Sequence, residues 1–252
     1  NALNIYYRGN SLVQLRYEAG RLIGRTHYKY LLRPTSQVCY VSSVDGHFNW
    51  ANQSFSKLWL QDLNDVEQLK AASLPYAGNE KTGVHRIIQS SKKVVVDLEI
   101  AIEKKAEETV RASAPRIDFA ALQEKRSSIE IMFFEVKHVS NPELRASGDV
   151  EPAVIRQIKS YERLLALYQQ QLVASYQKVC RNLVALFGCP SSQLIQRVAN
   201  GAELSVSTEP RLVIFGFDED QKQGAVWGGH CKKLCKALGE DRVLLRGNAA
   251  GF

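Results

Sequence analysis

The sequence predicts a mixed α/β (α+β) protein in which helices flank a central sheet, preceded by a β-rich N-terminal region. Residues 3–34 contain short runs rich in Tyr, Leu, Ile and Val, separated by Gly and Asn, a pattern typical of consecutive strands. Residues 116–122 and 129–139 are two further β-type runs joined by a polar turn. Residues 152–188 form a long helical stretch behind a proline suited to a first helical turn.

The N-terminal region, residues 1–90, is expected to begin with a β-meander over residues 3–34. Residues 36–44 are consistent with a strand, and residues 52–74 show apolar side chains at helical spacing. Residues 75–83, PYAGNEKTG, predict a loop. We interpret this region as a substrate- or partner-recognition module.

Residues 91–252 are expected to form the second domain. Leu98, Ile102, Ala106 and Val110 recur every four positions, so the sequence predicts a strand or linker that runs into a helix over residues 92–112. The helix should end before Pro115. The strands at 116–122 and 129–139 and the helical stretch follow, and then a strand at 210–217, a helix near 228–239 and a last strand near 242–247.

Composition restricts the function only loosely. The net charge of +7 suits a polyanionic partner, and no apolar run approaches the ~20 residues that span a membrane. The first residues lack a signal-peptide pattern, and five scattered cysteines fit a reducing cytoplasm. Cys231 and Cys235 are interpreted as the apolar face of a helix rather than as zinc ligands. The chain begins with Asn rather than Met, which fits a piece of a longer protein.

Three charged residues on apolar strands suggest chemistry. Asp118 lies in the strand at 116–122, and Glu135 and Lys137 lie two apart in the strand at 129–139, hence on one face. A hairpin would bring Asp118 toward Glu135. Two neighbouring carboxylates repel each other unless a cation lies between them, and oxygen ligands favour Mg²⁺. The alternative is a solvated salt bridge on an edge strand, with Asp118 paired to Arg116.

These residues resemble the PD-(D/E)XK nuclease superfamily, which has the restriction-endonuclease-like fold. The resemblance lies in RIDF at 116–119, FEVK at 134–137 and QIKSY at 157–161, which is similar to the Q-x-x-x-Y motif of the RecB-type branch. It covers residues 95–217. The usual Pro-Asp pair is Ile117-Asp118 here, with Pro115 displaced.

The resemblance implies a role for each matching residue. Asp118, Glu135 and the backbone carbonyl of Val136 would bind Mg²⁺, or Mn²⁺ as a substitute, and Lys137 would assist the attacking water. Gln157 would brace the catalytic strand or contact substrate, and Tyr161 would lie near the phosphate backbone. Gln157 and Tyr161 are i and i+4, so they share one helix face; the alternative is that this face is simply solvated.

Two further sets of candidates are less specific. The family often has another metal-binding Glu on the helix before the Asp strand, and Glu99, then Glu103, then Glu107 would match; a solvated acidic edge is the alternative. The loop after Lys137 carries His138, Asn141 and Arg145, which could contact phosphate. Ordinary loop polarity explains these three equally well.

The expected function is therefore that of a Mg²⁺-dependent cytoplasmic nuclease that hydrolyses nucleic-acid phosphodiester bonds, with DNA favoured over RNA as partner. A homodimer is compatible with this fold. The alternative is a catalytically silent nucleic-acid-binding or assembly module that keeps the nuclease fold. A P-loop and a G-x-S-x-G nucleophile motif are absent from the sequence.

Overall fold

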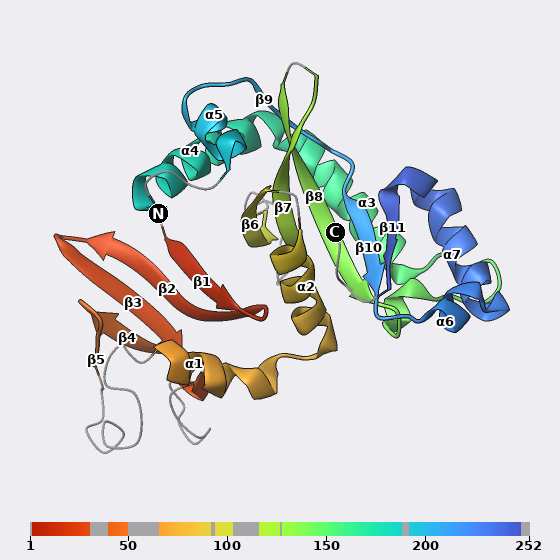
Figure 1. The fold of residues 1–252 in the computed structure, drawn as a ribbon, viewed down its shortest axis with the longest axis horizontal. Helices are drawn as coiled ribbons and strands as arrows, with labels where there is room; N and C mark the ends of the chain where they lie inside the picture. The colour runs from red at the N-terminus through yellow and green to blue at the C-terminus, as the bar shows by residue number, and fades with distance from the viewer. Residues whose placement is uncertain are drawn as a thin grey trace, which may run out of the picture. The chain divides into compact units, whose positions relative to one another are not determined.

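The computed structural model of the chain shows a mixed α/β protein with two sheets (Figure 1). It describes residues 2–30, 40–49, 66–91, 94–102, 116–126, 128–187 and 192–247. The chain divides into two compact units, residues 1–85 and 86–252, whereas the sequence analysis placed the boundary between residues 90 and 91. Each unit is described by itself.

The first unit contains an antiparallel sheet with the strand order β1-β2-β3-β4-β5. The strands are β1 (Leu3–Tyr7), β2 (Asn10–Glu18), β3 (Arg21–His27), β4 (Tyr40–Val44) and β5 (His47–Asn49). The predicted meander is confirmed for its described part. The short helices η1 (Tyr28–Tyr30), α1 (Val66–Ser73) and η3 (Leu74–Tyr76) complete the unit, together with the start of α2 (Asn79–Ser90).

Three tight turns join these strands, and each has a glycine in its second position. The turn dipeptides are Arg8-Gly9, Ala19-Gly20 and Asp45-Gly46, and both residues of each have positive φ. Two-residue loops with positive φ at both positions match the right-handed twist of an antiparallel hairpin. The local sequence therefore favours the register of the three hairpins β1–β2, β2–β3 and β4–β5.

The second unit is built on a mixed sheet with the order β11-β10-β8-β7-β6, in which β9 also pairs with β8. The strands are β6 (Val94–Ala101), β7 (Arg116–Glu124), β8 (Ile129–His138), β9 (Leu204–Val206), β10 (Arg211–Phe215) and β11 (Val243–Arg246). β6, β7 and β8 are antiparallel, whereas β10 is parallel to both β8 and β11. β8 is thus a central strand with neighbours along both edges.

Helices cover one face of this sheet. They are α3 (Ala153–Leu167), α4 (Gln169–Phe187), α5 (Gln193–Ala199) and α7 (Ala225–Leu238); the short helix α6 (Glu219–Gln223), which has no buried residue, precedes α7. Ile129, Ile131 and Phe133 of β8 share one buried cluster with residues of α3, α4 and α5. Ile155 and Ile158 of α3 share a second cluster with β10 and α7. Figure 1 shows α3 running alongside β8.

The structure corrects two predicted elements. Val94–Ala101 form strand β6, which takes up the strand alternative of the prediction for residues 92–112 and extends it past Leu98, where the four-residue spacing suggested a helix; the run of three valines favours the strand. Residues 79–83 begin helix α2, although Gly78 and Gly83 suggested a loop. Predictions for residues 50–65 and 103–115, including Glu103 and Glu107, lie outside the described residues.

Other predictions agree with the structure. The helical stretch at 152–188 consists of two helices, α3 and α4. Cys231 and Cys235 lie on α7 beside the buried Leu234 and Leu238, as expected for an apolar helix face. Within the described residues, no helix has both the length and the apolar character that crossing a bilayer requires.

Candidate active site

The predicted triad lies on the two central antiparallel strands β7 and β8. Phe119 pairs with Phe134 in their register, so continuing it by one residue brings Asp118 opposite Glu135. Alternate residues of a strand face the same side. Glu135 and Lys137 therefore continue the row of Phe133, which packs under the helices.

Glu135 and Lys137 are buried, with 2% and 7% of their surfaces exposed. Lys137 Nζ lies 2.9 Å from Glu135 Oε1 and 2.9 Å from Glu143 Oε2. The alternative of a solvated edge strand is therefore wrong, because β8 is flanked on both sides and both charges are shielded from water. Buried charges of this kind must be paired or must bind an ion.

Asp118 is bound to the neighbouring strand through its side chain. The amide of Val136 donates a hydrogen bond to Asp118 Oδ2 at 2.6 Å. Burial raises the pKa of Asp118 well above its ordinary value, and the negative charge of Glu135 raises it further. The Val136 hydrogen bond and the charge of Lys137 oppose this rise without cancelling it. The two carboxylates repel each other in a site that is shielded from water. A divalent cation bound between them would relieve this repulsion.

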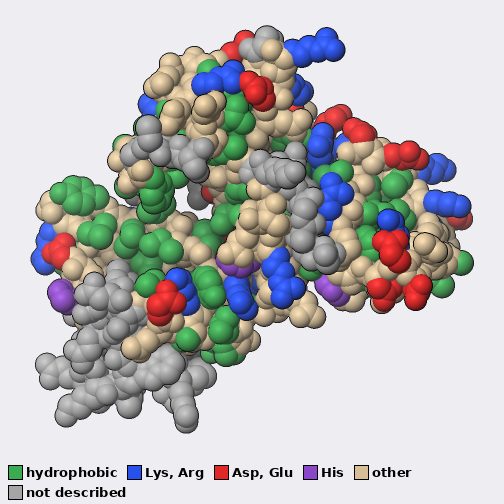
Figure 2. Space-filling view, in the orientation of Figure 1, with side chains coloured by type: hydrophobic (Ala, Val, Ile, Leu, Met, Phe, Trp, Pro, Cys, Tyr) green, Lys and Arg blue, Asp and Glu red, His purple; other side chains and the backbone are tan. Residues whose placement is uncertain are grey.

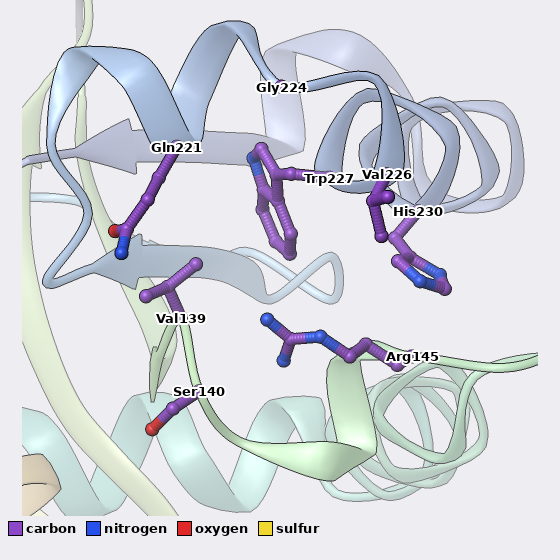
Figure 3. A pocket seen from close by; sticks show the side chains of 8 residues that line it. All are labelled: Val139, Ser140, Arg145, Gln221, Gly224, Val226, Trp227 and His230. Atoms are coloured by element: carbon purple, nitrogen blue, oxygen red, sulfur yellow. The ribbon is translucent and has the colours of Figure 1, made fainter.

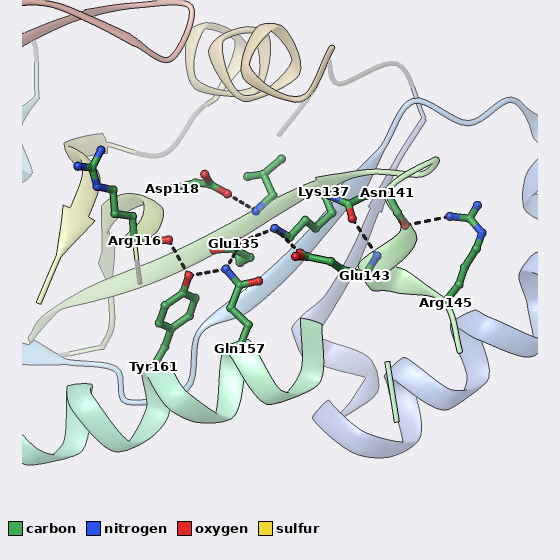
Figure 4. A network of polar contacts seen from close by, with 10 residues as sticks. Arg116, Asp118, Glu135, Lys137, Asn141, Glu143, Arg145, Gln157 and Tyr161 are labelled. Atoms are coloured by element: carbon green, nitrogen blue, oxygen red, sulfur yellow. Dashed lines mark hydrogen bonds and ion pairs between the residues drawn. The ribbon is translucent and has the colours of Figure 1, made fainter. Parts of the chain in front are cut away.

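Gln157 and Tyr161 support this pair from helix α3 (Figure 4). Gln157 Nε2 donates to Glu135 Oε1 at 2.9 Å and to the Tyr161 hydroxyl at 2.6 Å. The Tyr161 hydroxyl donates in turn to the carbonyl of Arg116 on β7, at 2.6 Å. One helix thereby holds both strands that carry the carboxylates.

The burial of Tyr161 decides against the alternative of a solvated helix face. Its surface is 0% exposed, and its hydroxyl group braces β7 through the carbonyl of Arg116. Its expected place near the phosphate backbone stays a prediction. Burial, followed by the charge of Glu135, raises the pKa of the Tyr161 hydroxyl, which keeps it protonated as a donor.

Glu99 lies near the triad but on a different element from the one expected. It belongs to strand β6 rather than to a helix, and Leu98 and Ile100 pair with Phe119 and Ile117. Glu99 is thus opposite Asp118, and its charge adds to the rise in the pKa of Asp118. Its carboxylate pairs with Arg116 at 3.8 Å, whereas the alternative of a solvated edge strand had Arg116 paired with Asp118.

His138 and Arg145 are not brought to the carboxylates. His138 alternates with Lys137 along β8 and faces the other side of the sheet, where its ring packs against Phe215. Arg145 donates to the carbonyl of Asn141 at 3.0 Å, and its guanidinium lies 5.6 Å from the ring centroid of Trp227. The choice of both residues rested on closeness in sequence, which does not fix the direction of a side chain.

Arg145 instead lines a pocket beyond the end of β8 (Figure 3). The pocket has a volume of about 320 Å³, and Val139, Trp227 and His230 also line it. Figure 3 shows the Arg145 side chain extending toward Trp227 across this space. Trp227 is buried and belongs to the hydrophobic cluster that α7 shares with α3 and β10.

Glu143 is a member of the network that the sequence analysis missed. The side chain of Asn141 accepts a hydrogen bond from Glu143 N at 2.9 Å and caps the short helix η4 (Pro142–Leu144). This turn brings Glu143 back to Lys137. The tripeptide Asn-Pro-Glu directly after a strand is a helix-start signal that could have indicated it.

Among the residues that the structure describes, no set of three or more His, Cys, Asp and Glu side chains is arranged to hold a metal ion. The site offers two carboxylates and the backbone of Val136. No family model, curated protein or solved structure matches this chain. The geometry of the site is therefore the basis of the functional argument.

Proposed function

We propose that this protein is a metal-dependent nuclease of the PD-(D/E)XK type, which hydrolyses nucleic-acid phosphodiester bonds. The observation that carries the proposal is the placement of half-buried Asp118 opposite buried Glu135 on adjacent strands, with buried Lys137 on the same face as Glu135. The mixed sheet with helices on one face is compatible with the restriction-endonuclease-like fold that the resemblance implies.

Asp118, Glu135 and the carbonyl of Val136 would hold the divalent ion. When bound, Mg²⁺ supplies positive charge that lowers the pKa of a water molecule and offsets charge that develops on the phosphate. The repulsion that raises the pKa of Asp118 supports this assignment, because a cation would stabilise the ionised carboxylate.

Lys137 contributes an ammonium that is held in place before substrate arrives. Its two carboxylate partners, Glu135 and Glu143, fix its position at the end of β8. From there it would orient a water molecule or stabilise the charge of the phosphate in the transition state. Gln157 acts as a positioning residue, because it touches Glu135 and Tyr161.

The test is cleavage of labelled single- and double-stranded DNA and RNA with Mg²⁺, Mn²⁺ or a chelator. Asp118→Asn and Lys137→Ala are each expected to lower Mg²⁺-dependent cleavage by about 10²-fold or more. Asp97→Asn is the matched control, because Asp97 is a half-buried carboxylate on the next strand, like Asp118, and accepts a hydrogen bond from the Tyr176 hydroxyl at 3.2 Å outside this network.

Stability must be measured beside activity, because the two site variants differ. Lys137→Ala leaves Glu135 buried without this cation, which costs about 3–5 kcal/mol in comparable cases. Asp118→Asn removes a repulsion and should keep the fold. Cleavage that survives in both variants, or that resists the chelator, would contradict the proposal. Calorimetric titration with Mg²⁺ separates it from a silent binding module, which need not take up metal at these carboxylates.

A further inference from the structure

Basic and aromatic side chains gather in the first unit, to which no residue of the candidate active site belongs. They come from the β1–β2 turn and from η1, α1, η3 and α2, which are far apart in the sequence. We call them the lysine–tyrosine cluster, which consists of Arg8, Lys29, Lys70, Lys81, Tyr7, Tyr30 and Tyr76. Figure 2 shows blue side chains of Lys and Arg beside green ones over the start of α2.

Lys29 lies between two aromatic rings. Its Nζ atom is 4.9 Å from the ring centroid of Tyr30 and 4.8 Å from that of Tyr76. The two rings meet edge to face, with centroids 5.9 Å apart. Lys70 Nζ and the Arg8 guanidinium lie 5.7 Å and 5.6 Å from the ring of Tyr7. Cations over ring faces are attracted by the aromatic quadrupole, so the rings position these charges.

The fold also fixes Lys81. A Cβ atom on Gly9 would come within 2.9 Å of the Lys81 side chain, and Gly9 has a φ of +67°. Lys81 Nζ donates to Asn10 Oδ1 at 3.2 Å, and buried Asn10 donates to the carbonyl of Ser73 at 3.2 Å. The β1–β2 turn therefore packs against α2, while Lys81 remains exposed.

The positive charges of the cluster repel each other. Burial lowers the pKa of Lys29, and the charge of Lys81 lowers it further. The pKa of His85, whose ring lies 5.5 Å from that of Tyr7, is lowered by burial and then by Arg8. Glu67 pairs with Lys70 at 2.5 Å, and Glu80 is a further carboxylate of these helices, so the cations of the cluster outnumber the nearby acids. A polyanion would relieve this repulsion.

We propose that the lysine–tyrosine cluster binds the phosphate backbone of a single-stranded nucleic acid, with exposed Tyr76 providing a stacking face for a base. Cations that follow a backbone, together with aromatic faces, are the features that bind single strands without sequence preference. This proposal rests on the proposed nuclease function, since it assigns the cluster to the same substrate. An anionic membrane surface is the competing occupant, which the test includes.

The experiment measures binding of a labelled single-stranded DNA or RNA to the full chain by fluorescence anisotropy, in a chelator so that no cleavage occurs. Lys29→Gln and Lys81→Gln are combined, and the affinity is measured over a range of salt concentrations. We expect a higher Kd, and a slope of log K against log salt that is shallower by about 0.7 for each lysine that contacts a phosphate.

Arg21→Gln is the matched control, because it removes one positive charge from the same unit at an exposed ion pair with Asp45. Lys81→Gln alone guards against a folding defect from Lys29→Gln, since Lys81 is exposed. The control should retain both affinity and slope. An unchanged Kd in the lysine variants, an equal loss in the control, or binding to phosphatidylserine vesicles but not to single strands would overturn the proposal.

Failure of this inference is distinguishable from failure of the nuclease proposal. A chain that binds strands through the cluster but never cuts them would contradict the nuclease proposal alone. A chain that cuts with Mg²⁺ but binds equally well without the two lysines would contradict the inference alone.

Discussion

Asp97 illustrates how burial in this sheet controls ionisation. It pairs with Ala120 across β6 and β7, and its carboxylate accepts a hydrogen bond from the Tyr176 hydroxyl at 3.2 Å. Burial raises its pKa above the ordinary value of 3.8, and its hydrogen bonds to Leu98 N and Tyr176 only partly offset this. The folded protein therefore favours the protonated form of Asp97.

This shift predicts a pH-dependent stability. The contribution of Asp97 is fully present below pH 3.8, the unfolded value, and is lost as the pH rises through the raised folded pKa. Asp97→Asn keeps an uncharged side chain at every pH. The unfolding free energy of this variant, relative to that of the wild type, should therefore rise as the pH increases from 4 to 7.

Urea unfolding of both proteins at several pH values in a chelator measures this difference. A difference that stays constant from pH 4 to pH 7 would show that Asp97 does not change its pKa on folding. Tyr176→Phe provides a second readout, because loss of the hydroxyl donor should raise the pKa of Asp97 further.

Individual site residues could be predicted only where a local rule fixed their direction. Glu135 and Lys137 share a face because they are two apart on a strand, and Gln157 and Tyr161 meet because they are four apart on a helix. The direction of His138 follows from the same strand rule, which the choice of phosphate contacts did not apply. Glu143 depends on a turn that folds back six residues later, so its contact with Lys137 is tertiary.

Glycines of the second unit have opposite roles in two of its helices. Gly201 follows α5 with a φ of +95°, and its amide donates to Val198 O while Ala202 N donates to Arg197 O. This is the Schellman arrangement, which ends a helix with a residue in a left-handed conformation. Gly229 lies inside helix α7, where an added Cβ atom would meet nothing within 4 Å.

Two alanine substitutions should consequently change stability in opposite directions. Gly201→Ala is expected to lower the unfolding free energy by about 1 kcal/mol, because the Cβ atom of alanine is sterically strained at a positive φ. Gly229→Ala is expected to raise it by about 0.5–1 kcal/mol, because alanine is the better helix former. Denaturant unfolding of the two variants measures both effects. Changes of the same sign in the two unfolding free energies would contradict the roles assigned to Gly201 and Gly229.

The elements that the sequence predicts well are those with one dominant local signal. β7 and β8 are continuous apolar runs, and both are found where they were expected. β6 was predicted only as a strand or linker that runs into a helix, because its last apolar residues also fit a four-residue spacing, and its pairing with β7 decides in favour of a strand up to Ala101. Helix α2 contains Gly83, although glycine lowers the stability of a helix. Burial of Ile87 one turn later helps to offset this loss.

Each of the two units has a buried core of its own. Leu12, Val13, Tyr30, Val41, Phe48 and Leu69 form the cluster of the first unit. The clusters of the second unit consist of residues from β6 onward. The polar network of the candidate active site lies entirely in the second unit, and the lysine–tyrosine cluster in the first. The two proposed tasks, cutting and holding a strand, are therefore assigned to different cores.

This division predicts the behaviour of a shortened chain. Because α2 begins at Asn79 and includes the boundary at residue 85, a fragment of residues 79–252 keeps this helix whole. The fragment should fold, since both of its clusters remain, and should retain Mg²⁺-dependent cleavage at saturating substrate. Its KM for a single strand should be about tenfold higher than that of the full chain, and less sensitive to salt, because the phosphate contacts of the first unit are gone. Circular dichroism establishes the fold, and steady-state cleavage at several salt concentrations gives kcat and KM. An unchanged KM would remove the first unit from substrate binding, and a folded fragment with a kcat below one tenth of the full chain's would show that residues before Asn79 contribute to the chemistry itself.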